Sequence, residues 1–413
     1  MLNVRNVIAN IYKSDILRFR VAQILFIAAI SFGWFIADGY RRGLFLLAIL
    51  LLNKSQRKIS VICHWKGLTG VTGTLLVTLF LWVTLVPLFS GMEPLPDRIE
   101  GMARPIEVFL YGVGIMIFAK DKFFEKYLSS FSVASAVFVS VFAFSRRAVL
   151  SFSVIRDDWV FGMHAALAGL IIASLLPWLL YAICEKKKTP LRKGFYIIIT
   201  MVALGAIFVT YYRTIWIAVT VQLLFAIPLS YYCFNANPLN HKRLLVVLIL
   251  FIAAVVGYSY HTSFIIRDRF DRLMSAGCDF KNFTNNRGEI WKDAMSLISK
   301  RKLGGYGWVS YDDFAVIKMH HPHSSYLDAA FHAGIPAGIL YGMVFIASFL
   351  LALRYILTKT GPASIAYVVF LMLLATAVGG LTEAFFYESR EYVVPFWSMT
   401  SLLVSPLYLK KEG

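Results

Sequence analysis

The sequence predicts an all-α fold: a polytopic transmembrane helical bundle of about 12 spans with one large, partly helical loop. Two observations predict this fold. The chain of 413 residues is 59% hydrophobic and only 15% charged, whereas soluble globular domains are typically about 45–50% apolar and about 25% charged. Its apolar residues also gather in segments that approach the roughly 20 residues a helix needs to cross a bilayer.

The expected spans are the apolar segments 21–37, 43–53, 69–90, 105–119, 127–145, 161–184, 195–211, 214–233, 244–260, 334–353, 363–381 and 393–408. Segment 43–53 is short for a full span, so about eleven spans is the alternative. We therefore expect a transmembrane domain at 1–260 (spans 1–9), a large periplasmic loop at 261–322, and a second transmembrane part at 323–413 (spans 10–12).

The distribution of Lys and Arg predicts the orientation, because these residues collect on cytoplasmic loops. With both termini in the cytoplasm, 22 of the 41 Lys and Arg fall inside, and 10 of the others fall within 261–322. Loops of about 60 residues obey the rule poorly; without this loop the count is 22 inside against 9 outside. The net charge of +18 then reflects topology, and we expect no nucleic acid partner.

The loop at 261–322 contains one readable helix. Asn286 followed by Glu289 is typical of a capping box at a helix start. Gly304-Gly305 predicts the helix end. Between them, apolar residues repeat at helical spacing: Trp291, Ala294, Met295 and Ile298. We expect this amphipathic helix to pack on the membrane domain or on a substrate lipid.

Arg287 lies in the first turn of that helix, where a cation opposes the helix dipole. A helix N-terminus with an added guanidinium is, however, a good phosphate site. The alternative is an exposed arginine without a role. Arg213 joins two apolar segments with almost no loop between them, flanked by Tyr211, Tyr212 and Trp216. An arginine at this depth faces a cavity or a partner, or it extends to the headgroups.

Three histidines close the loop, in His320-His321-Pro322-His323. A metal site is one interpretation, but Pro322 extends the backbone and no carboxylate ligand is near in sequence. A neutral imidazole before the expected short helix 326–332 can instead act as a general base. The sequence shows no D-x-D and no Cys/His cluster at zinc spacing, so we expect no metal and no cofactor.

These motifs together resemble the O-antigen ligase family of the bacterial ligase/polymerase superfamily. His323-Ser324, nine residues, and then Gly334-Ile-Pro-Ala337-Gly338 is similar to the family signature His-[Asn/Ser/Gln]-x9-Gly-x-x-Gly. Further similarities are Arg287-Gly-Glu-Ile-Trp291, Leu303-Gly-Gly-Tyr-Gly307-Trp308 and Thr210-x-x-Arg213. Two positions depart from the pattern: Ala337 stands where the second glycine belongs, and Tyr212 replaces a serine.

The resemblance implies a GT-C-like, metal-independent glycosyltransferase in the bacterial inner membrane. Such an enzyme transfers O-antigen polysaccharide from undecaprenyl diphosphate to a sugar hydroxyl of the lipid A–core, at the periplasmic face and with inversion. Membrane lipids surround it. On this interpretation His323 is the general base, and Arg213 and Arg287 bind the diphosphate and stabilise its developing charge.

Further substrate contacts are expected from Trp291, His321, Ser324 and Glu383. Glu383 ends an apolar segment, where an ionisable residue indicates a function; an ion pair with Arg390 is the alternative. Two other functions remain open. An O-antigen polymerase uses the same donor, although its family members usually have two basic outer loops. A lipid-linked oligosaccharide flippase would need several charges within its spans, and few are found.

Overall fold

The computed structural model describes residues 15–34, 38–52, 66–90, 92, 94–149, 165–185, 188–208, 210, 212–234, 257, 267, 271, 287–381, 383–384 and 390–409. Its helices are α2 (Asp15–Ser31), α3 (Asp38–Leu50), α4 (Gly67–Ser90), α5 (Leu95–Phe118), α6 (Lys122–Val149), α7 (Ala165–Cys184), α8 (Pro190–Phe208), α9 (Arg213–Phe234), α13 (Arg287–Lys300), α14 (Ser325–Thr358), α15 (Ala363–Gly380), α16 (Arg390–Ser401) and α17 (Pro406–Leu409). Two short 3-10 turns are η2 (Tyr311–Asp313) and η3 (Leu402–Val404).

Among the described residues, 8 helices are long and apolar enough to cross a membrane: α4, α5, α6, α7, α8, α9, α14 and α15. The prediction of a polytopic helical membrane protein is confirmed, while the number of spans differs. In place of the first two expected spans stand α2, with 17 residues, and α3, with 13 residues. In place of the last expected span, 393–408, the structure has a shorter apolar helix at Val393–Val404. The expected span at 244–260 lies outside the described residues, apart from residue 257.

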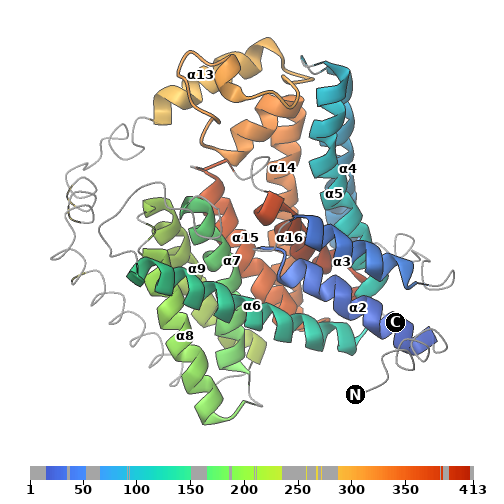
Figure 1. The fold of residues 1–413 in the computed structure, drawn as a ribbon, viewed down its shortest axis with the longest axis vertical. Coiled ribbons are helices and arrows are strands. Elements are labelled where there is room, and N and C mark those ends of the chain that lie inside the picture. The colour runs from blue at the N-terminus through green and yellow to red at the C-terminus, as the bar shows by residue number, and fades with distance from the viewer. Residues whose placement is uncertain are drawn as a thin grey trace.

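The bundle is organised around α14 and α15. Helix α14 packs against α4 and α15, and α15 packs in turn against α9 and α7. Helix α7 also contacts α6 and α8, while α16 packs on α5. Figure 1 shows α13 at one end of the molecule, next to the first turns of α14. We call this the loop end of the bundle.

A sharp reversal divides α14 at the loop end. Ala333 and Gly334 have non-helical backbone angles, so a short helix up to His332 is followed by a long one. The expected short helix with its stop at Gly334 is therefore confirmed. The short helix folds back along the long one, because Tyr326 lies 5.3 Å from Tyr341, ring centroid to ring centroid.

The loop residues 287–322 form a small core of their own on the short helix. The buried face of α13 consists of Ile290, Ala294, Leu297 and Ile298. It packs with Tyr306, Tyr311 and Phe331, and the rings of Tyr306 and Phe331 stack at 4.9 Å. Two expectations are corrected here. Met295 is exposed rather than buried, and α13 ends at Lys300, before Gly304-Gly305.

Backbone hydrogen bonds fasten the loop to the end of the short helix. The amides of Tyr306 and Gly307 donate to the carbonyls of Phe331 and His332 at 2.8 and 3.0 Å. The last carbonyls of a helix have no partner within the helix, so the loop supplies partners for them. Loop and short helix are consequently one structural unit, which fixes the position of the residues just before α14.

Candidate functional site

Three side chains from distant parts of the chain meet beneath the loop. Arg287, the first residue of α13, places its Nη2 atom 2.6 Å from Oε1 of Glu383. His323, two residues before α14, places its Nδ1 atom 3.4 Å from Oε2 of the same carboxylate. One carboxylate thus links a guanidinium and an imidazole. As expected, Arg287 and His323 lie at one site, and both contact the carboxylate of Glu383.

Glu383 is buried and firmly held. Only 6% of the residue is exposed, and its carbonyl accepts a hydrogen bond of 2.8 Å from Oγ of Ser325. Burial alone would raise the pKa of this carboxyl. The hydrogen bond from His323 and the charge of Arg287 outweigh burial and lower the pKa to about 2. Glu383 is therefore a carboxylate at neutral pH, paired with Arg287. The side chain of Arg390, its expected alternative partner, lies outside the description.

His323 has an unusual backbone, with a φ of 49°. Its amide donates to Nδ1 of His321 at 3.2 Å, and the two rings lie 4.3 Å apart, edge to face. Its carbonyl accepts a long hydrogen bond of 3.4 Å from Nε1 of Trp291 in α13. A left-handed conformation is uncommon outside glycine and is found at functional sites. His321 and Trp291, expected as substrate contacts, thus hold His323 in place.

The neighbouring His321 is neutral at pH 7. Burial, followed by the nearby His323, lowers the pKa of His321 to about 4. Ser324 precedes α14 with an extended backbone and is also buried. Its carbonyl accepts the amide of Asp328 at 2.8 Å. Ser324 therefore stabilises the start of α14 through its main-chain carbonyl.

The same centre contains a set of atoms that could hold a metal ion. His321, His323 and Glu383 each offer one ligand atom, and these atoms all lie within 4.8 Å of one another. Imidazole and carboxylate ligands suit zinc and other divalent metals. The carboxylate is, however, already paired with Arg287 at 2.6 Å, and a cation beside a metal site weakens it by repulsion.

Arg213 is the first residue of α9, and α8 ends at Phe208, so the expected short connection between two spans is present. The side chain of Arg213 lies outside the description. Around it, Oγ1 of Thr210 donates to the carbonyl of Ile207 at 2.7 Å, and Nε1 of Trp216 donates to the same carbonyl at 3.3 Å. The connection is thereby tied to the end of α8.

Two glycines explain why α14 can reverse. Gly334 has a φ of 83°, and a Cβ atom there would clash with the carbonyl of Leu303. A Cβ at Gly338 would lie 3.1 Å from both the Tyr326 carbonyl and the Cβ of Ala330. The small residue is needed at 338, where the short helix crosses the long one. The alanine at 337 is simply buried core.

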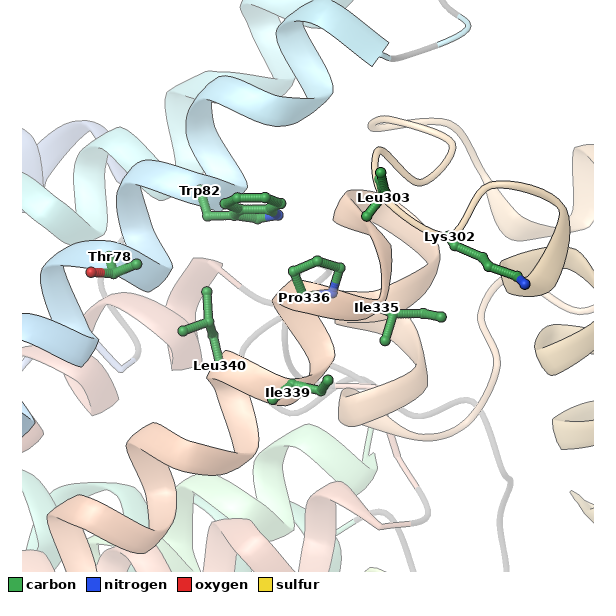
Figure 2. Close-up of a pocket in the computed structure, with 8 residues that line it drawn as sticks. All are labelled: Thr78, Trp82, Lys302, Leu303, Ile335, Pro336, Ile339 and Leu340. Carbon is green, nitrogen blue, oxygen red and sulfur yellow. The ribbon is translucent and has the colours of Figure 1, made fainter.

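A second feature of the loop end is an apolar groove of about 560 Å³ between α4 and α14. Figure 2 shows its lining: Thr78, Trp82, Lys302, Leu303, Ile335, Pro336, Ile339 and Leu340. Nε1 of Trp82 donates to the carbonyl of Ala333 at 2.9 Å, at the reversal. The groove suits a hydrocarbon chain. By helical spacing, Ile335 and Ile339 lie on the opposite face of α14 from Tyr341, which faces the short helix.

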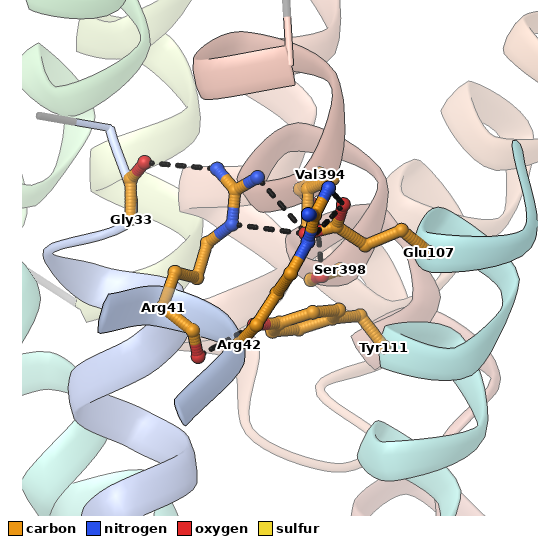
Figure 3. A network of polar contacts seen from close by, with 7 residues as sticks. All are labelled: Gly33, Arg41, Arg42, Glu107, Tyr111, Val394 and Ser398. Atoms are coloured by element: carbon orange, nitrogen blue, oxygen red, sulfur yellow. Dashed lines mark hydrogen bonds and ion pairs between the residues drawn. The ribbon is translucent and has the colours of Figure 1, made fainter. Parts of the chain in front are cut away.

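Sequence reasoning missed a charged cluster formed by Arg41, Arg42 and Glu107. Figure 3 shows the Glu107 carboxylate between the two guanidinium groups, with Val394 and Ser398 of α16 close by. Nη2 of Arg41 lies 3.0 Å from Oε1, and Nη2 of Arg42 lies 2.7 Å from Oε2. A signal was available, since Glu107 falls inside the apolar segment 105–119, where a charge indicates a function.

Residues 198–342 match a family model described as O-antigen ligase. The matched range contains Arg213, Arg287, His321 and His323, and it ends within α14, while Glu383 lies beyond it. No curated protein matches the chain.

Proposed function

We propose that this chain, of which residues 198–342 match a family model described as O-antigen ligase, acts as an O-antigen ligase. It transfers O-antigen polysaccharide from undecaprenyl diphosphate to a sugar hydroxyl of the lipid A–core, without a metal. The observation that supports this proposal best is the centre of Arg287, His323 and Glu383. This centre brings Arg287 and His323, which lie in the matched range, together with Glu383, which follows α15.

His323 is the general base of the proposed reaction. The Glu383 carboxylate, 3.4 Å from Nδ1, favours the tautomer with the proton on Nδ1, because a carboxylate accepts and cannot donate. Nε2 then carries the lone pair and takes the proton of the acceptor hydroxyl. A histidine base of this kind contributes about 10²–10⁴-fold to the rate.

The bond changes follow from the leaving group. The acceptor oxygen attacks the anomeric carbon of the donor sugar as its proton moves to His323. The bond from that carbon to the diphosphate oxygen breaks, and the electron pair leaves with undecaprenyl diphosphate. Direct displacement inverts the anomeric centre. Arg213 and Arg287 stabilise the negative charge that develops on the diphosphate, which as a stable anion needs no general acid.

The proposed setting is the bacterial inner membrane, with both termini in the cytoplasm and the loop end at the periplasmic face. The charge count supports this orientation, since 22 Lys and Arg fall on the cytoplasmic side against 9 outside the large loop. The small core of α13 on the short helix supports a loop that covers the centre. Covering the centre limits access of water, which would otherwise compete with the acceptor.

A substitution at His323 tests the proposal. We expect purified His323→Ala to lose ligation by about 10²–10⁴-fold, measured as transfer of polymer from undecaprenyl diphosphate to lipid A–core in the presence of a chelator. The matched control is His320→Ala, because the His320 side chain is 87% exposed. Ligation by His323→Ala at the parent rate would reject the base assignment. Loss of ligation by the parent in chelator would reject the metal-free mechanism.

O-antigen polymerase is the alternative for the same donor, and the single large loop in the sequence favours the ligase. A cell lacking the protein separates the two functions. Loss of a ligase leaves polymer on the lipid carrier, whereas loss of a polymerase leaves a single repeat attached to the core.

A further inference from the structure

The short helix of α14 contains a buried ionisable pair that the proposed reaction does not use. Asp328 and His332 are four residues apart, so they lie on one face of the helix. Nε2 of His332 lies 3.3 Å from Oδ1 of Asp328, and the two side chains are 5% and 1% exposed. Among the described residues, His332 is the ion-pair partner of Asp328, whose carboxyl oxygens accept no hydrogen bond from them.

The contacts of His332 fix the number of protons in this pair. Nδ1 of His332 lies 2.6 Å from the carbonyl oxygen of Gly307, and a carbonyl only accepts, so Nδ1 carries a proton. If Nε2 and Asp328 both lacked a proton, a buried carboxylate would face a lone pair without any counter-charge, which is costly. One further proton therefore lies on Nε2 or on Asp328. In both cases the pair is neutral as a whole.

The pair lies where the loop is fastened to the end of the short helix. The amide of Gly307 donates to the carbonyl of His332 at 3.0 Å, so the ring and the main chain of His332 hold the same loop residue. The ring of Trp308 also stacks on His332 at 5.5 Å. At the start of the short helix, Nε1 of Trp291 in α13 donates to the carbonyl of His323. The loop is thus held at both ends of the short helix.

We propose that Asp328 and His332 share one proton in the folded protein and act as positioning residues, which hold the loop over the centre of Arg287, His323 and Glu383. Without this proton, the carboxylate would repel the lone pair of Nε2 and displace the ring that binds the loop. Arg287 belongs to α13 of that loop, so its position relative to His323 depends on the fastening. The positioning role rests on the proposed function, whereas the shared proton and the fastening do not.

The shared proton makes stability depend on pH above neutrality. An unfolded histidine and an unfolded aspartate have pKa values of about 6.5 and 3.9, so above pH 6.5 the unfolded chain releases this proton. The folded pair keeps it. Where the folded state binds more protons, stability falls as the pH rises. The pair therefore contributes stability that is fully present below pH 6.5 and declines above it.

Other ionisable groups near the pair do not account for this trend. Helix α4, which packs on α14, has no ionisable side chain. The described ionisable groups on the other surrounding elements are Arg98 and Arg104 of α5, Arg287, Arg301, Lys302, Tyr306, His321 and His323 of the loop, Tyr367 of α15, and Glu383. His321 and Glu383, with pKa values of about 4 and 2, do not titrate above pH 6.5. All these groups are common to the parent and a variant of Asp328, so a comparison of the two isolates the pair.

Asp328→Asn tests the shared proton. The amide of asparagine can donate to Nε2 of a neutral His332, so the bond to Gly307 is kept without the extra proton. We expect the unfolding temperature of the parent to fall relative to Asp328→Asn by about 2 °C per pH unit between pH 6.5 and 8.5. Thermal unfolding of the purified full-length protein in detergent measures it. The matched control Asp313→Asn, at an exposed acid of the loop, should follow the parent.

Hydrogen exchange tests the fastening. His332→Ala removes the donor to Gly307 and leaves the Asp328 carboxylate buried without its partner. We expect the amides of residues 305–309 to exchange at least tenfold faster than in the parent at the same pH, and kcat for ligation to fall by a similar factor. Asp328→Asn should exchange and ligate like the parent at pH 7, because the same loop contact is kept. If His332→Ala does not fold, the comparison of the parent with Asp328→Asn still tests the pair.

Three results would overturn the inference. An unfolding temperature of Asp328→Asn that changes with pH as in the parent would reject the shared proton. Exchange of residues 305–309 in His332→Ala at the parent rate would reject the fastening. Faster exchange in His332→Ala with the kcat of the parent would reject the positioning role. A parent that shows the expected pH dependence and exchange but no ligation would reject the ligase and leave the proton-sharing pair.

Discussion

At the scale of single residues, Glu383 is the group on which the centre depends. Its two carboxylate oxygens face different partners, Arg287 at 2.6 Å and His323 at 3.4 Å. A carboxylate that orients a histidine base fixes both the tautomer and the direction of the ring, as in the Ser-His-Asp triad. We therefore treat Glu383 as a positioning residue of the proposed reaction, a role different from the substrate contact expected from the sequence.

Substitution of Glu383 by glutamine should lower kcat by about 100-fold or more. The amide can donate to Nδ1 of His323 and so favour the wrong tautomer, which lowers kcat; it also removes the charge that holds Arg287, so the KM for the donor changes as well. Ligation kinetics with varied donor would separate kcat from KM. Glu383→Asp keeps the charge and should recover part of the lost rate. A Glu383→Gln enzyme with the kcat of the parent, or one that loses activity only through KM, would contradict the positioning role.

At the scale of elements, the reversal of α14 positions His323, the proposed base. The short helix is held by the loop through the amides of Tyr306 and Gly307, and it crosses the long helix at Gly338. His323 precedes this short helix directly, so its position depends on the geometry of the crossing. The glycines of the loop and of α14 therefore influence the position of the proposed base through the backbone.

Gly334→Ala should destabilise the protein by about 2–4 kcal/mol, because the backbone there has a φ of 83° and an alanine side chain would strain it. The added Cβ would also clash with the Leu303 carbonyl. Thermal unfolding in detergent would measure the loss. Gly342→Ala is the matched control in the same helix, since a Cβ there has nothing within 4 Å; it should be neutral or stabilise by up to about 1 kcal/mol. Equal unfolding temperatures for the two variants would refute the strained reversal.

At the scale of the whole molecule, the burial of titratable groups makes stability depend on pH. His321 has a pKa of about 4 in the folded protein, against an ordinary value of 6.5. The unfolded chain therefore binds a proton below pH 6.5 that the folded chain accepts only near pH 4. Glu383, with a pKa of about 2 against 4.5, extends the same trend to lower pH. Glu383 therefore contributes stability at neutral pH that is lost as the pH falls below 4.5, whereas the buried neutral His321 costs stability once the pH falls below 6.5.

The expected result is a fall in unfolding temperature of several degrees between pH 6.5 and pH 4. Replacing His321 with Asn should remove the part of this fall that lies above pH 4.5, where Glu383 is ionised in both states. Thermal unfolding of parent and His321→Asn across this pH range would show it. Parallel curves for the two proteins would contradict the assignment to His321.

Much of the fold could be predicted from the sequence, because apolar length and flanking charge act locally. The short connection before Arg213 and the short helix after His323 are local features of this kind. The site could be predicted only in part. Arg287 and His323 have local signals, but their shared partner Glu383 lies 96 and 60 residues away. The sequence suggested Arg390 as the partner of Glu383 only because the two residues are close in the chain. The pairing of Arg41 with Glu107, 66 residues apart, could not be predicted for the same reason.

The linkage of Arg287, His323 and Glu383 also sets the order in which the enzyme can be made. Glu383 leaves the ribosome 60 residues after His323, and α14 and α15 must insert into the bilayer before it reaches its partners. A nascent chain that already carries the arginine and the histidine therefore still lacks the carboxylate that links them. The centre is complete only when α14 and α15 are both in place.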